Sequence, residues 1–325
     1  MSHDEQLLAI LRKRPGHYVS GAELAERLGV SRTTVWNHVE ALRAEGYVIE
    51  AATHRGYRFV ASPDRMLPDE VRRGLRTAWL GHTLWAYRET DSTNDIALAR
   101  AAEGAPEGAA VLAELQRRGR GRFHRKWLSP PGVNILASVI FRPQLHPSLV
   151  SQLVIAAAVA VAETLRALHD LDAHIKWPND VCVGGKKIAG ILAELSAEAE
   201  QVNHVVVGVG LNVNVTADQL QKDLRATATS LCIELGHAVS RLDVLRRLFL
   251  DLEHWYERWR RHGFAPVKAR WAELSSSLGR RVEVVSGKAK TTGLVADLDD
   301  DGALVLRLDA GPIKRVASGD MTVVG

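Results

Sequence analysis

The sequence is poor in cysteine and contains no apolar run long enough to span a membrane. Its two cysteines, Cys182 and Cys232, are far apart and form no metal-binding or redox spacing, which fits a reducing compartment. The longest apolar stretch, residues 153–162, is too short for a bilayer and predicts a buried helix. The first residues include acidic side chains and no apolar signal core. We therefore expect a cytoplasmic protein with no membrane partner.

The chain also lacks a large excess of charge, internal repeats and low-complexity tracts. Its 325 residues carry a formal net charge of only +4, so any binding of polyanions must come from local patches. The length predicts two or three domains. A hydrophobic content of 46% provides enough apolar material for a sizeable core.

Residues 1–62 have the pattern of a winged helix-turn-helix domain. Three short stretches with helical spacing of apolar residues are followed by two predicted strands around a turn at residues 53–56. Ala25, Gly29 and Val35 occupy the small, turn and apolar positions of a helix-turn-helix, and Ser31 is the expected N-cap of its second helix. This arrangement resembles domains that place one helix in the major groove of DNA.

The predicted DNA contacts lie on that second helix and on the wing. An alternative is a helical interaction module that never touches DNA. Residues 1–60 hold eight Arg or Lys against seven Asp or Glu, a net charge of +1, so one copy should bind DNA weakly and two copies on a two-fold site are needed. The residues expected to contact DNA are Ser31, Arg32, Thr33, Trp36, Asn37 and Arg55, with His54 and Arg58 beside them on the wing.

The rest of the chain predicts an α/β domain and a small β-barrel, after a linker at residues 61–70. Between residues 63 and 274, several predicted strands alternate with helices, which indicates a mixed sheet. Trp255 and Trp259, four residues apart on a predicted helix over 241–261, are expected in the core. From residue 275 to 325, apolar and polar residues alternate around Gly and Asp turns, which predicts four or five strands.

The most basic segment of the chain is residues 117–127. Six of its eleven residues are Arg or Lys, none is acidic, and two glycines lie among them. Arginine pairs with phosphate and carboxylate groups through two parallel donors, while glycine allows the backbone to approach a ligand. A nucleic-acid arm and a loop that closes over a small anion are both conceivable. The predicted strands on either side favour the ligand loop, because arginine–glycine tails belong to low-complexity sequence.

Three further polar stretches are candidates for the same site. Residues 91–94, DSTN, begin a predicted helix and suit a polar ligand group, although the sequence is also a routine helix cap. Residues 176–180, KWPND, offer a lysine to phosphates and two oxygen donors to hydrated Mg²⁺. Lys187 begins a predicted strand and can stabilise negative charge on a reacting group. Each lysine by itself could equally be a solvated surface residue.

Taken together, these stretches resemble the biotin protein ligases. The motifs DSTN, QxxGRGRxxRxW, KWPND, GGKKIAGIL and GVGLNVN occur in the family's order and spacing. Because the resemblance covers the whole chain, it implies the bifunctional group that also represses the biotin operon. It implies a multidomain α+β fold: a winged helix-turn-helix in residues 1–62, a class II synthetase-like ligase domain with a mixed sheet in 63–274, and an SH3-like barrel in 275–325.

The resemblance implies two activities. The ligase would form biotinyl-5′-adenylate from biotin and ATP with Mg²⁺, and would transfer biotin to a lysine of a biotin carboxyl carrier protein. The repressor would bind operator DNA as a homodimer when it holds the adenylate. Three alternatives remain at this stage: a ligase with no repressor role, a ligand-sensing transcription factor with an inactive ligase core, and a ligase for another acid such as lipoate or octanoate.

The same resemblance assigns roles to residues of this sequence. The catalytic residues would be Lys187, Arg120 and Arg122. The biotin-binding residues would be Ser92, Thr93, Asn94, Gln116, Arg120, Gly121, Arg122 and Lys187. The residues serving ATP and Mg²⁺ would be Arg125, Lys176, Asn179 and Asp180, with Asp180 as the metal ligand and as a candidate base for the transfer step.

The sequence departs from the family pattern at three places. Arg118 replaces a small residue and His124 replaces a glycine, so the loop should be stiffer or differently charged. Residues 228–231, ATSL, lack the tryptophan that stacks on adenine in some repressor ligases. We therefore expect altered retention of the adenylate and a different contact with adenine.

Overall fold

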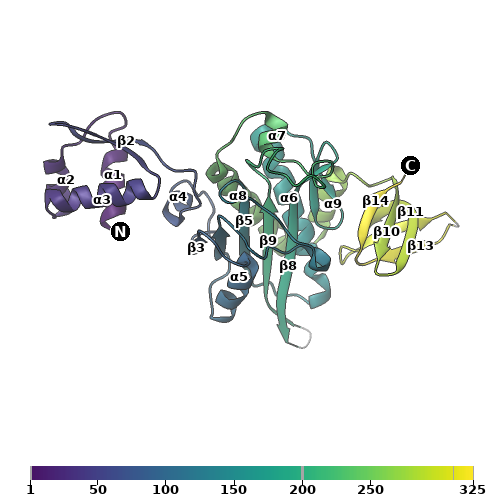
Figure 1. The fold of residues 1–325 in the computed structure, drawn as a ribbon. Coiled ribbons are helices and arrows are strands. Elements are labelled where there is room, and N and C mark those ends of the chain that lie inside the picture. The colour runs from purple at the N-terminus through teal and green to yellow at the C-terminus, as the bar shows by residue number, and fades with distance from the viewer. Residues whose placement is uncertain (1, 199–200, 310, 325) are drawn as a thin grey trace. The chain divides into compact units, whose positions relative to one another are not determined.

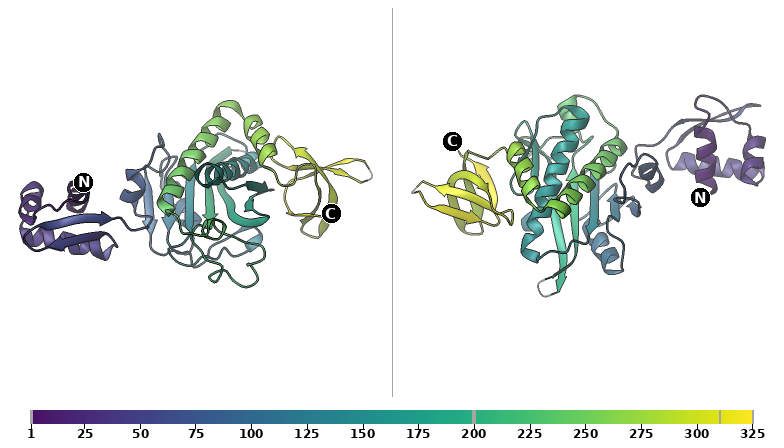
Figure 2. Two further views of the ribbon diagram at one scale, coloured as in Figure 1. Left: turned by 90° about the horizontal axis from the view of Figure 1, so that it is seen from above. Right: turned by 180° about the vertical axis from the view of Figure 1, so that it is seen from behind.

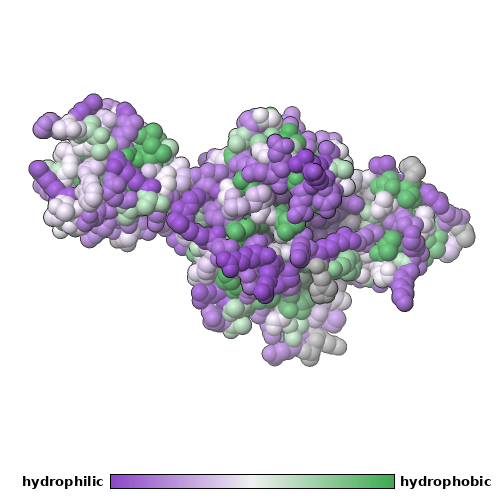
Figure 3. Space-filling model, viewed as in Figure 1, coloured by the Kyte–Doolittle hydropathy of each residue, from purple (hydrophilic) through white to green (hydrophobic). Residues whose placement is uncertain are grey.

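The computed structural model describes residues 2–198, 201–309 and 311–324, apart from the side chain of His124. The chain forms two compact units, Met1–Arg65 and Met66–Gly325 (Figure 1). In the space-filling view, hydrophilic side chains cover most of the visible face of each unit, with small hydrophobic areas between them (Figure 3).

The first unit has three helices and a two-stranded hairpin, as the sequence predicts. The elements are α1 (His3–Arg12), α2 (Gly21–Leu28), α3 (Arg32–Ala44), β1 (Val48–Ala52) and β2 (Gly56–Ala61). The Ser31 hydroxyl caps α3 by accepting a hydrogen bond of 3.1 Å from the Thr34 amide. Gly29 ends α2 with a φ of 67°, a left-handed conformation that glycine adopts without strain. Buried Leu24, Val35 and Val39 then hold α2 and α3 together.

The second unit is built on a seven-stranded sheet in the order β3-β4-β5-β9-β8-β7-β6. Only the β3–β4 pair is parallel, and the other neighbours are antiparallel, so the sheet is mixed as expected. Its strands are β3 (Leu84–Tyr87), β4 (Ala110–Ala113), β5 (Ile135–Phe141), β6 (Ala173–Lys176), β7 (Asp180–Val183), β8 (Lys186–Glu198) and β9 (Gln201–Leu211).

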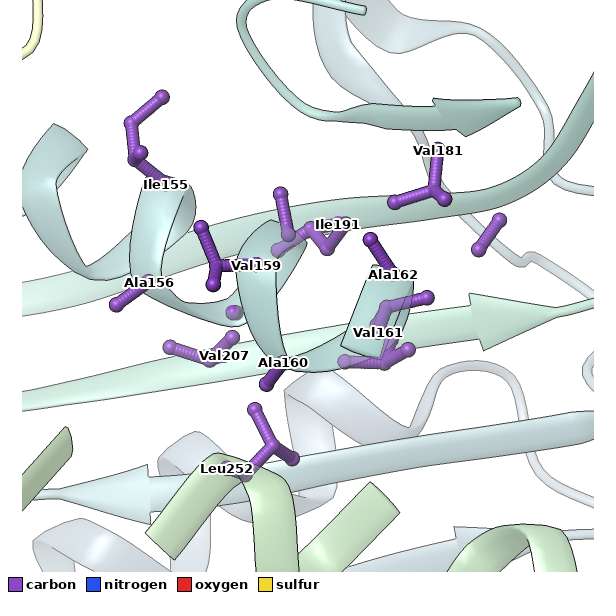
Figure 4. Packing of buried hydrophobic residues seen from close by; sticks show 14 of the residues in the cluster. Ile155, Ala156, Val159, Ala160, Val161, Ala162, Val181, Ile191, Val207 and Leu252 are labelled. Carbon is purple, nitrogen blue, oxygen red and sulfur yellow. The ribbon is translucent and has the colours of Figure 1, made fainter. Parts of the chain in front are cut away.

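Helices α6 (Val150–His169) and α8 (Arg241–His262) cover one face of this sheet (Figure 2). Val159 of α6 packs beside Val207 of β9 and Leu252 of α8 (Figure 4). The segment 147–169 is long and apolar enough to cross a membrane, but 72% of its most apolar window is buried inside the protein. It is therefore the core helix that the sequence predicts.

The opposite face of the sheet carries α5 (Thr93–Ala102), which packs on β4, β5 and β9 through a small cluster that includes Ala97, Ala101 and Val206. Trp255 and Trp259 of α8 are buried on the α6 side, which confirms their place in the core. The Trp259 indole donates a 2.7 Å hydrogen bond to Gln152 of α6.

Four helices and strands do not follow from the sequence, and one of them is the short helix α7 (Leu231–Leu235). Helix α4 (Pro68–Arg73) takes up the end of the predicted linker, because Val71 is fully buried. Strand β7 begins at Asp180, directly after the turn of KWPND, and pairs with both β6 and β8. Helix α9 (Ala265–Leu274) contributes Trp271 to the core. Short strands and helices of this kind carry too few residues to show a clear period.

A five-stranded antiparallel sheet in the order β13-β12-β11-β10-β14 completes the unit. Its strands are β10 (Arg281–Ser286), β11 (Ala289–Leu298), β12 (Leu304–Leu308), β13 (Ile313–Val316) and β14 (Asp320–Val323). The turn before β12 contacts the segment between β6 and β7, where the Gly302 carbonyl accepts a 3.0 Å hydrogen bond from the buried Trp177 indole. The Ser151 hydroxyl of α6 donates to the Asp301 carbonyl beside it.

Candidate active site

Glycines on the sheet leave room for a cavity on the face opposite α6 and α8. Successive residues of a strand point to opposite faces. In β9, Val207 and Val209 therefore face the helices, while Gly208 and Gly210 face the other side. A Cβ on Gly208 would lie 2.2 Å from Asn94 Oδ1, and one on Gly210 would lie 2.5 Å from the Trp127 ring. The cavity above these glycines measures about 260 Å³.

One end of the cavity is polar and uncharged. Ser92, Thr93 and Asn94 at the start of α5 are almost completely buried. Ser92 is the N-cap by backbone position, yet its side chain makes no capping hydrogen bond. Gln116 supplies the cap instead, since its Oε1 accepts bonds from the Thr93 amide at 2.8 Å and the Thr93 hydroxyl at 3.0 Å. The DSTN stretch is therefore more than a self-contained helix cap.

Asn94 is held in one orientation by two neighbours. The Ser138 hydroxyl of β5 lies 2.6 Å from Asn94 Oδ1, while Asn94 Nδ2 donates a 2.6 Å hydrogen bond to Glu194 of β8. Ser138 is fully buried. An acceptor on one side and a donor on the other fix which edge of the amide faces the cavity.

The basic loop forms the roof of the cavity, and Arg120 is its most strongly paired residue. The Arg120 guanidinium donates to both oxygens of Asp95, at 2.8 and 2.5 Å, and to Glu194 at 3.1 Å. The hydrogen bonds to Asp95 raise the pKa of Arg120 above its ordinary value. Arg120 therefore contacts carboxylates of the protein itself at the place where the sequence predicts a carboxylate ligand.

Arg122 is the more buried arginine of the loop, and its partners are neutral. Its Nη1 donates to Asn179 Oδ1 at 3.3 Å and to the Gly319 carbonyl at 3.2 Å. Burial lowers the pKa of Arg122 from its ordinary value, because the charged form loses hydration. No carboxylate lies within ion-pairing distance of Arg122 in the described part of the chain. This guanidinium can accept an incoming anion without first releasing a carboxylate.

The C-terminal sheet reaches the edge of the cavity. Asp320, the first residue of β14, lines the cavity and forms an ion pair with Arg125. Arg117 and Arg118 point elsewhere, since they pair with Glu89 and Asp91 at the surface. The side chain of Arg118 is 81% exposed, so its large size does not disturb the cavity. The other unusual residue of the loop, His124, has a side chain outside the part of the chain that the structure describes.

Lys187, near the start of β8, lines the cavity. Its Nζ is 2.7 Å from Asp180 Oδ1 and 5.5 Å from the centre of the Trp127 ring. The ring covers Gly190 and Gly210, which explains why neither position carries a side chain. Cys182 lies close by, but burial raises the pKa of its thiol to about 11, so it is not a thiolate nucleophile at neutral pH.

An aliphatic wall closes the cavity on the side of the loop after β9. Leu220, Leu224 and Ala228 line it, and Ala228 forms a backbone bridge to Lys187. Ala228 begins the stretch of residues 228–231 that lacks the adenine-stacking tryptophan of some repressor ligases. The cavity surface at this point is formed by alkyl groups.

The structure brings together all but one of the residues predicted for ligand binding. Lys176, at the end of β6, does not line the cavity. The predicted residues that do line it are Ser92, Thr93, Asn94, Gln116, Arg120, Gly121, Arg122, Arg125, Asn179, Asp180 and Lys187. Several other residues in or beside the cavity had no predicted role, namely Asp95, Trp127, Ser138, Gly190, Glu194, Gly208, Gly210 and Asp320.

Two of these omissions had a signal in the sequence. Trp127 is the last residue of the QxxGRGRxxRxW motif, and Gly208 and Gly210 alternate within GVGLNVN. Glycines at every second position of a strand indicate a close approach on one face. The partners Asp95, Glu194 and Asp320 had no such signal, because they come from α5, β8 and β14 and meet the loop only in the folded chain.

In the first unit, the residues predicted to contact DNA lie on one exposed surface of α3. Ser31, Arg32, Thr33, Trp36 and Asn37 are all exposed, and the Trp36 ring is 53% exposed. On the hairpin, Arg55 is exposed and lies over the Tyr18 ring at 4.3 Å. Arg58 differs, since it forms an ion pair with Glu50, which leaves less of its charge for a phosphate.

Comparison with known proteins agrees with this architecture. Residues 85–212 match the model of the biotin/lipoate A/B protein ligase family, residues 3–58 match an HTH domain, and residues 277–324 match the biotin protein ligase C-terminal domain. The chain is 36% identical to the bifunctional ligase/repressor BirA of Bacillus spizizenii, over 98% of this chain and 97% of the relative. The chain belongs to the bifunctional ligase/repressor family.

Other members support the same assignment. The BirA ligase/repressor of Escherichia coli is 30% identical over 98% of this chain and 96% of its own. The solved structure of a biotin protein ligase from Aquifex aeolicus, in complex with biotin and ATP, matches 75% of this chain and 99% of its own with a TM-score of 0.64 and 28% identity. This member of the family is thus a ligase with an N-terminal HTH domain.

Proposed function

We propose that the protein joins biotin to ATP, forming biotinyl-5′-adenylate and pyrophosphate, and then transfers biotin to a lysine of a biotin carboxyl carrier protein. One observation carries the proposal: a single cavity combines a buried neutral polar end, a basic loop and Lys187. A neutral polar end and a basic end match the two ends of biotin, which are an uncharged ureido ring and a carboxylate.

The ureido ring would lie at the start of α5. Ser92, Asn94 and Gln116 offer donors and acceptors there, and the Ser92 hydroxyl has no hydrogen-bond partner among the described residues. The carboxylate would point toward Arg120 and Arg122. A buried polar group binds well only where its hydrogen bonds are satisfied, so this end selects a ligand with the ureido pattern.

Adenylation brings a carboxylate against a polyphosphate, and the cationic side chains reduce their repulsion. Arg122 and Lys187 would face the reacting oxygens, and Arg125 the phosphates. Leu220 and Leu224 would contact the adenine in place of a stacked tryptophan. Arg120, Arg122 and Lys187 are in this proposal the residues that touch the reacting groups.

Magnesium would be held by Asp180 and Asn179 together with the phosphates of ATP. These side chains supply only part of a magnesium site, which is usual because Mg²⁺ keeps several waters and binds proteins through one or two carboxylates. No group of three His, Cys, Asp or Glu side chains suited to a metal occurs in the part of the chain that the structure describes. The ion, when bound with ATP, would supply positive charge to the phosphates.

The transfer step needs an uncharged acceptor lysine and a dry adenylate. Asp180 is the carboxylate nearest to Lys187 and would accept the proton of the incoming amine. The basic loop and the Trp127 ring, which lies against Gly190 and Gly210, would exclude water from the mixed anhydride and so protect it from hydrolysis.

We also propose a division of labour between domains. Residues 1–62 would bind operator DNA, residues 63–274 would carry out catalysis, and residues 275–325 would complete the cavity through Asp320. The adenylate-bound protein would form a homodimer, which places two copies of α3 on a two-fold operator. We propose a cytoplasmic location, because the protein would use ATP and bind DNA.

The decisive test of the ligase is a transfer assay with purified protein, biotin, ATP, Mg²⁺ and a biotin carboxyl carrier domain. We expect pyrophosphate release and one biotin on one acceptor lysine. Pyrophosphate release driven by lipoate or octanoate but not by biotin would overturn the choice of acid.

Repression is tested by titrating operator DNA with and without biotin and ATP. An unchanged affinity for DNA would refute the coupling between adenylate binding and repression.

A further inference from the structure

Two carboxylates bind the same guanidinium, that of Arg120, beside the proposed biotin site. Asp95 of α5 binds both Nη atoms of Arg120, at 2.8 and 2.5 Å, and Glu194 of β8 binds Nη2 with both of its oxygens at 3.1 Å. The three groups together carry a formal charge of −1. An incoming carboxylate therefore meets a guanidinium whose positive charge is already outweighed by two carboxylates.

The two carboxylates are held very differently. Glu194 accepts a second strong hydrogen bond, from Asn94 Nδ2 at 2.6 Å, and its side chain is 31% exposed. Asp95 is 49% exposed, and among the described residues Arg120 is its only recorded side-chain partner. An exposed ion pair is worth little, whereas a carboxylate with several charge-assisted bonds costs much more to remove.

Glu194 also connects the two ends of the ligand site. It binds Asn94, which lies at the polar end, and Arg120, which lies on the roof. Ser138 holds the other side of the Asn94 amide, so the network runs from β5 in the sheet to the basic loop. Only a side chain with two acceptor oxygens and no donor can satisfy both Asn94 Nδ2 and Arg120 Nη2.

We propose that Glu194 is a positioning residue for Arg120 and Asn94, and that Asp95 is an internal competitor that occupies the face of Arg120 used by the substrate's carboxylate. This inference rests on the proposed function. When the acid binds, its carboxylate replaces Asp95 on the Nη1–Nη2 edge, while Glu194 stays in place. The bidentate geometry of Asp95 is the geometry that a carboxylate ligand takes on an arginine fork.

The proposal predicts opposite effects for two substitutions of similar size. Asp95→Asn removes the competing charge and should lower the Kd for biotin about threefold. Glu194→Gln places an amide donor against either Arg120 or Asn94 and should raise that Kd about tenfold. Glu198→Gln is the matched control, because Glu198 is exposed at the end of the same strand and should leave the Kd unchanged.

Biotin binding is measured by titration calorimetry on the full chain without ATP, and pyrophosphate release gives KM and kcat for the same variants. A general loss of structure would weaken binding in both variants and lower the thermal midpoint, so tighter binding in Asp95→Asn is a result that instability cannot produce. If Glu194→Gln does not fold, the sign of the Asp95→Asn effect decides.

Weaker or unchanged binding in Asp95→Asn overturns the inference, as does unchanged binding in a folded Glu194→Gln. A failure of this inference can be distinguished from a failure of the proposed function by the behaviour of the wild-type chain. If the wild-type chain binds no biotin and releases no pyrophosphate, the function is wrong and the inference falls with it. If the wild type is active and only the variants disagree, the inference alone is wrong.

Discussion

The basic loop of residues 117–127 and the helix α3 present positive charge in opposite ways. In the loop, Arg117, Arg118, Arg120 and Arg125 each pair with a carboxylate from another element of the fold. On α3, Arg32 is exposed and forms no ion pair among the described residues, while Arg43 pairs with Glu40 of the same helix. Four of the six basic residues of the loop thus have a carboxylate partner, whereas Arg32, which is predicted to contact DNA, has none among the described residues.

This contrast shows that charge along the sequence is a poor guide to the partner. A polyanion needs unpaired charges that repeat along an open surface, because its binding comes largely from released counterions. A small anion needs a few donors in fixed directions, and neighbouring carboxylates fix those directions. Substitutions in the two segments, and changes in salt, should therefore have different effects on catalysis and on DNA binding.

The largest effect is expected at Lys187, where charge would build up in the reaction. We expect Lys187→Ala to lower the kcat for biotin-dependent pyrophosphate release by on the order of 10²–10³, as for the removal of one group that stabilises developing charge. The control is Lys186→Ala, since Lys186 is exposed one residue earlier on the same strand. Equal activity of the two variants would contradict the role of Lys187.

Within the loop, Arg122 and Arg118 should differ sharply. Arg122→Ala removes a half-buried donor without a carboxylate partner, and we expect the kcat/KM for biotin to fall about 10²-fold, the loss seen when one fixed donor is removed. Arg118→Ala removes a side chain that is 81% exposed, and we expect a change of less than about twofold. Pyrophosphate release measures both, and a similar loss at both positions would show that only total charge matters.

On α3, the substitutions should affect DNA and spare catalysis. We expect Arg32→Ala to weaken operator binding about tenfold, since one good base or phosphate contact is worth about 1–3 kcal/mol. Transfer of biotin should be unchanged. Arg14→Ala is the control, because Arg14 lies outside α3 and pairs with Glu23. A gel-shift titration measures the affinity, and an equal effect of the control would indicate that general charge drives binding.

The smallest change should be that of the KM for biotin when the salt concentration is raised. Between 50 and 200 mM salt, we expect operator affinity to fall by at least about tenfold, because counterions are released on binding. The KM for biotin should change by less than about twofold, since short-range buried contacts are screened weakly. Parallel titrations test this, and a steep salt dependence of the KM would mean that the loop acts through its long-range field.

Much of the fold follows from the sequence because its elements are long or strongly patterned. The period of apolar residues in 149–169 and 241–261 indicates α6 and α8, and the alternation after residue 275 indicates the strands of the second sheet. Strand β7 and helix α9 were not expected. Strand β7 has four residues and follows a turn, so pairing with β6 and β8 determines its conformation.

The sequence motifs indicate the candidate ligand residues but not the contacts that these residues make. The sequence identifies Gln116 as a ligand candidate, whereas the structure shows that it caps α5 across 23 positions of the chain. Lys176 appeared equivalent to its neighbours in KWPND, yet it does not line the cavity, because it lies at the end of β6 before the turn.

The sequence by itself determined the order of the domains, the family and the residue types available for chemistry, because local periodicity and motif spacing are properties of the chain. Only the tertiary structure decided which charges remain unpaired. Asp95, Glu194 and Asp320 reach the loop from α5, β8 and β14, and their pairing depends on distances that no spacing in the sequence encodes. The fold thus surrounds the basic stretch with carboxylates, which local composition could not show and which supports the proposal that the stretch is a ligand loop.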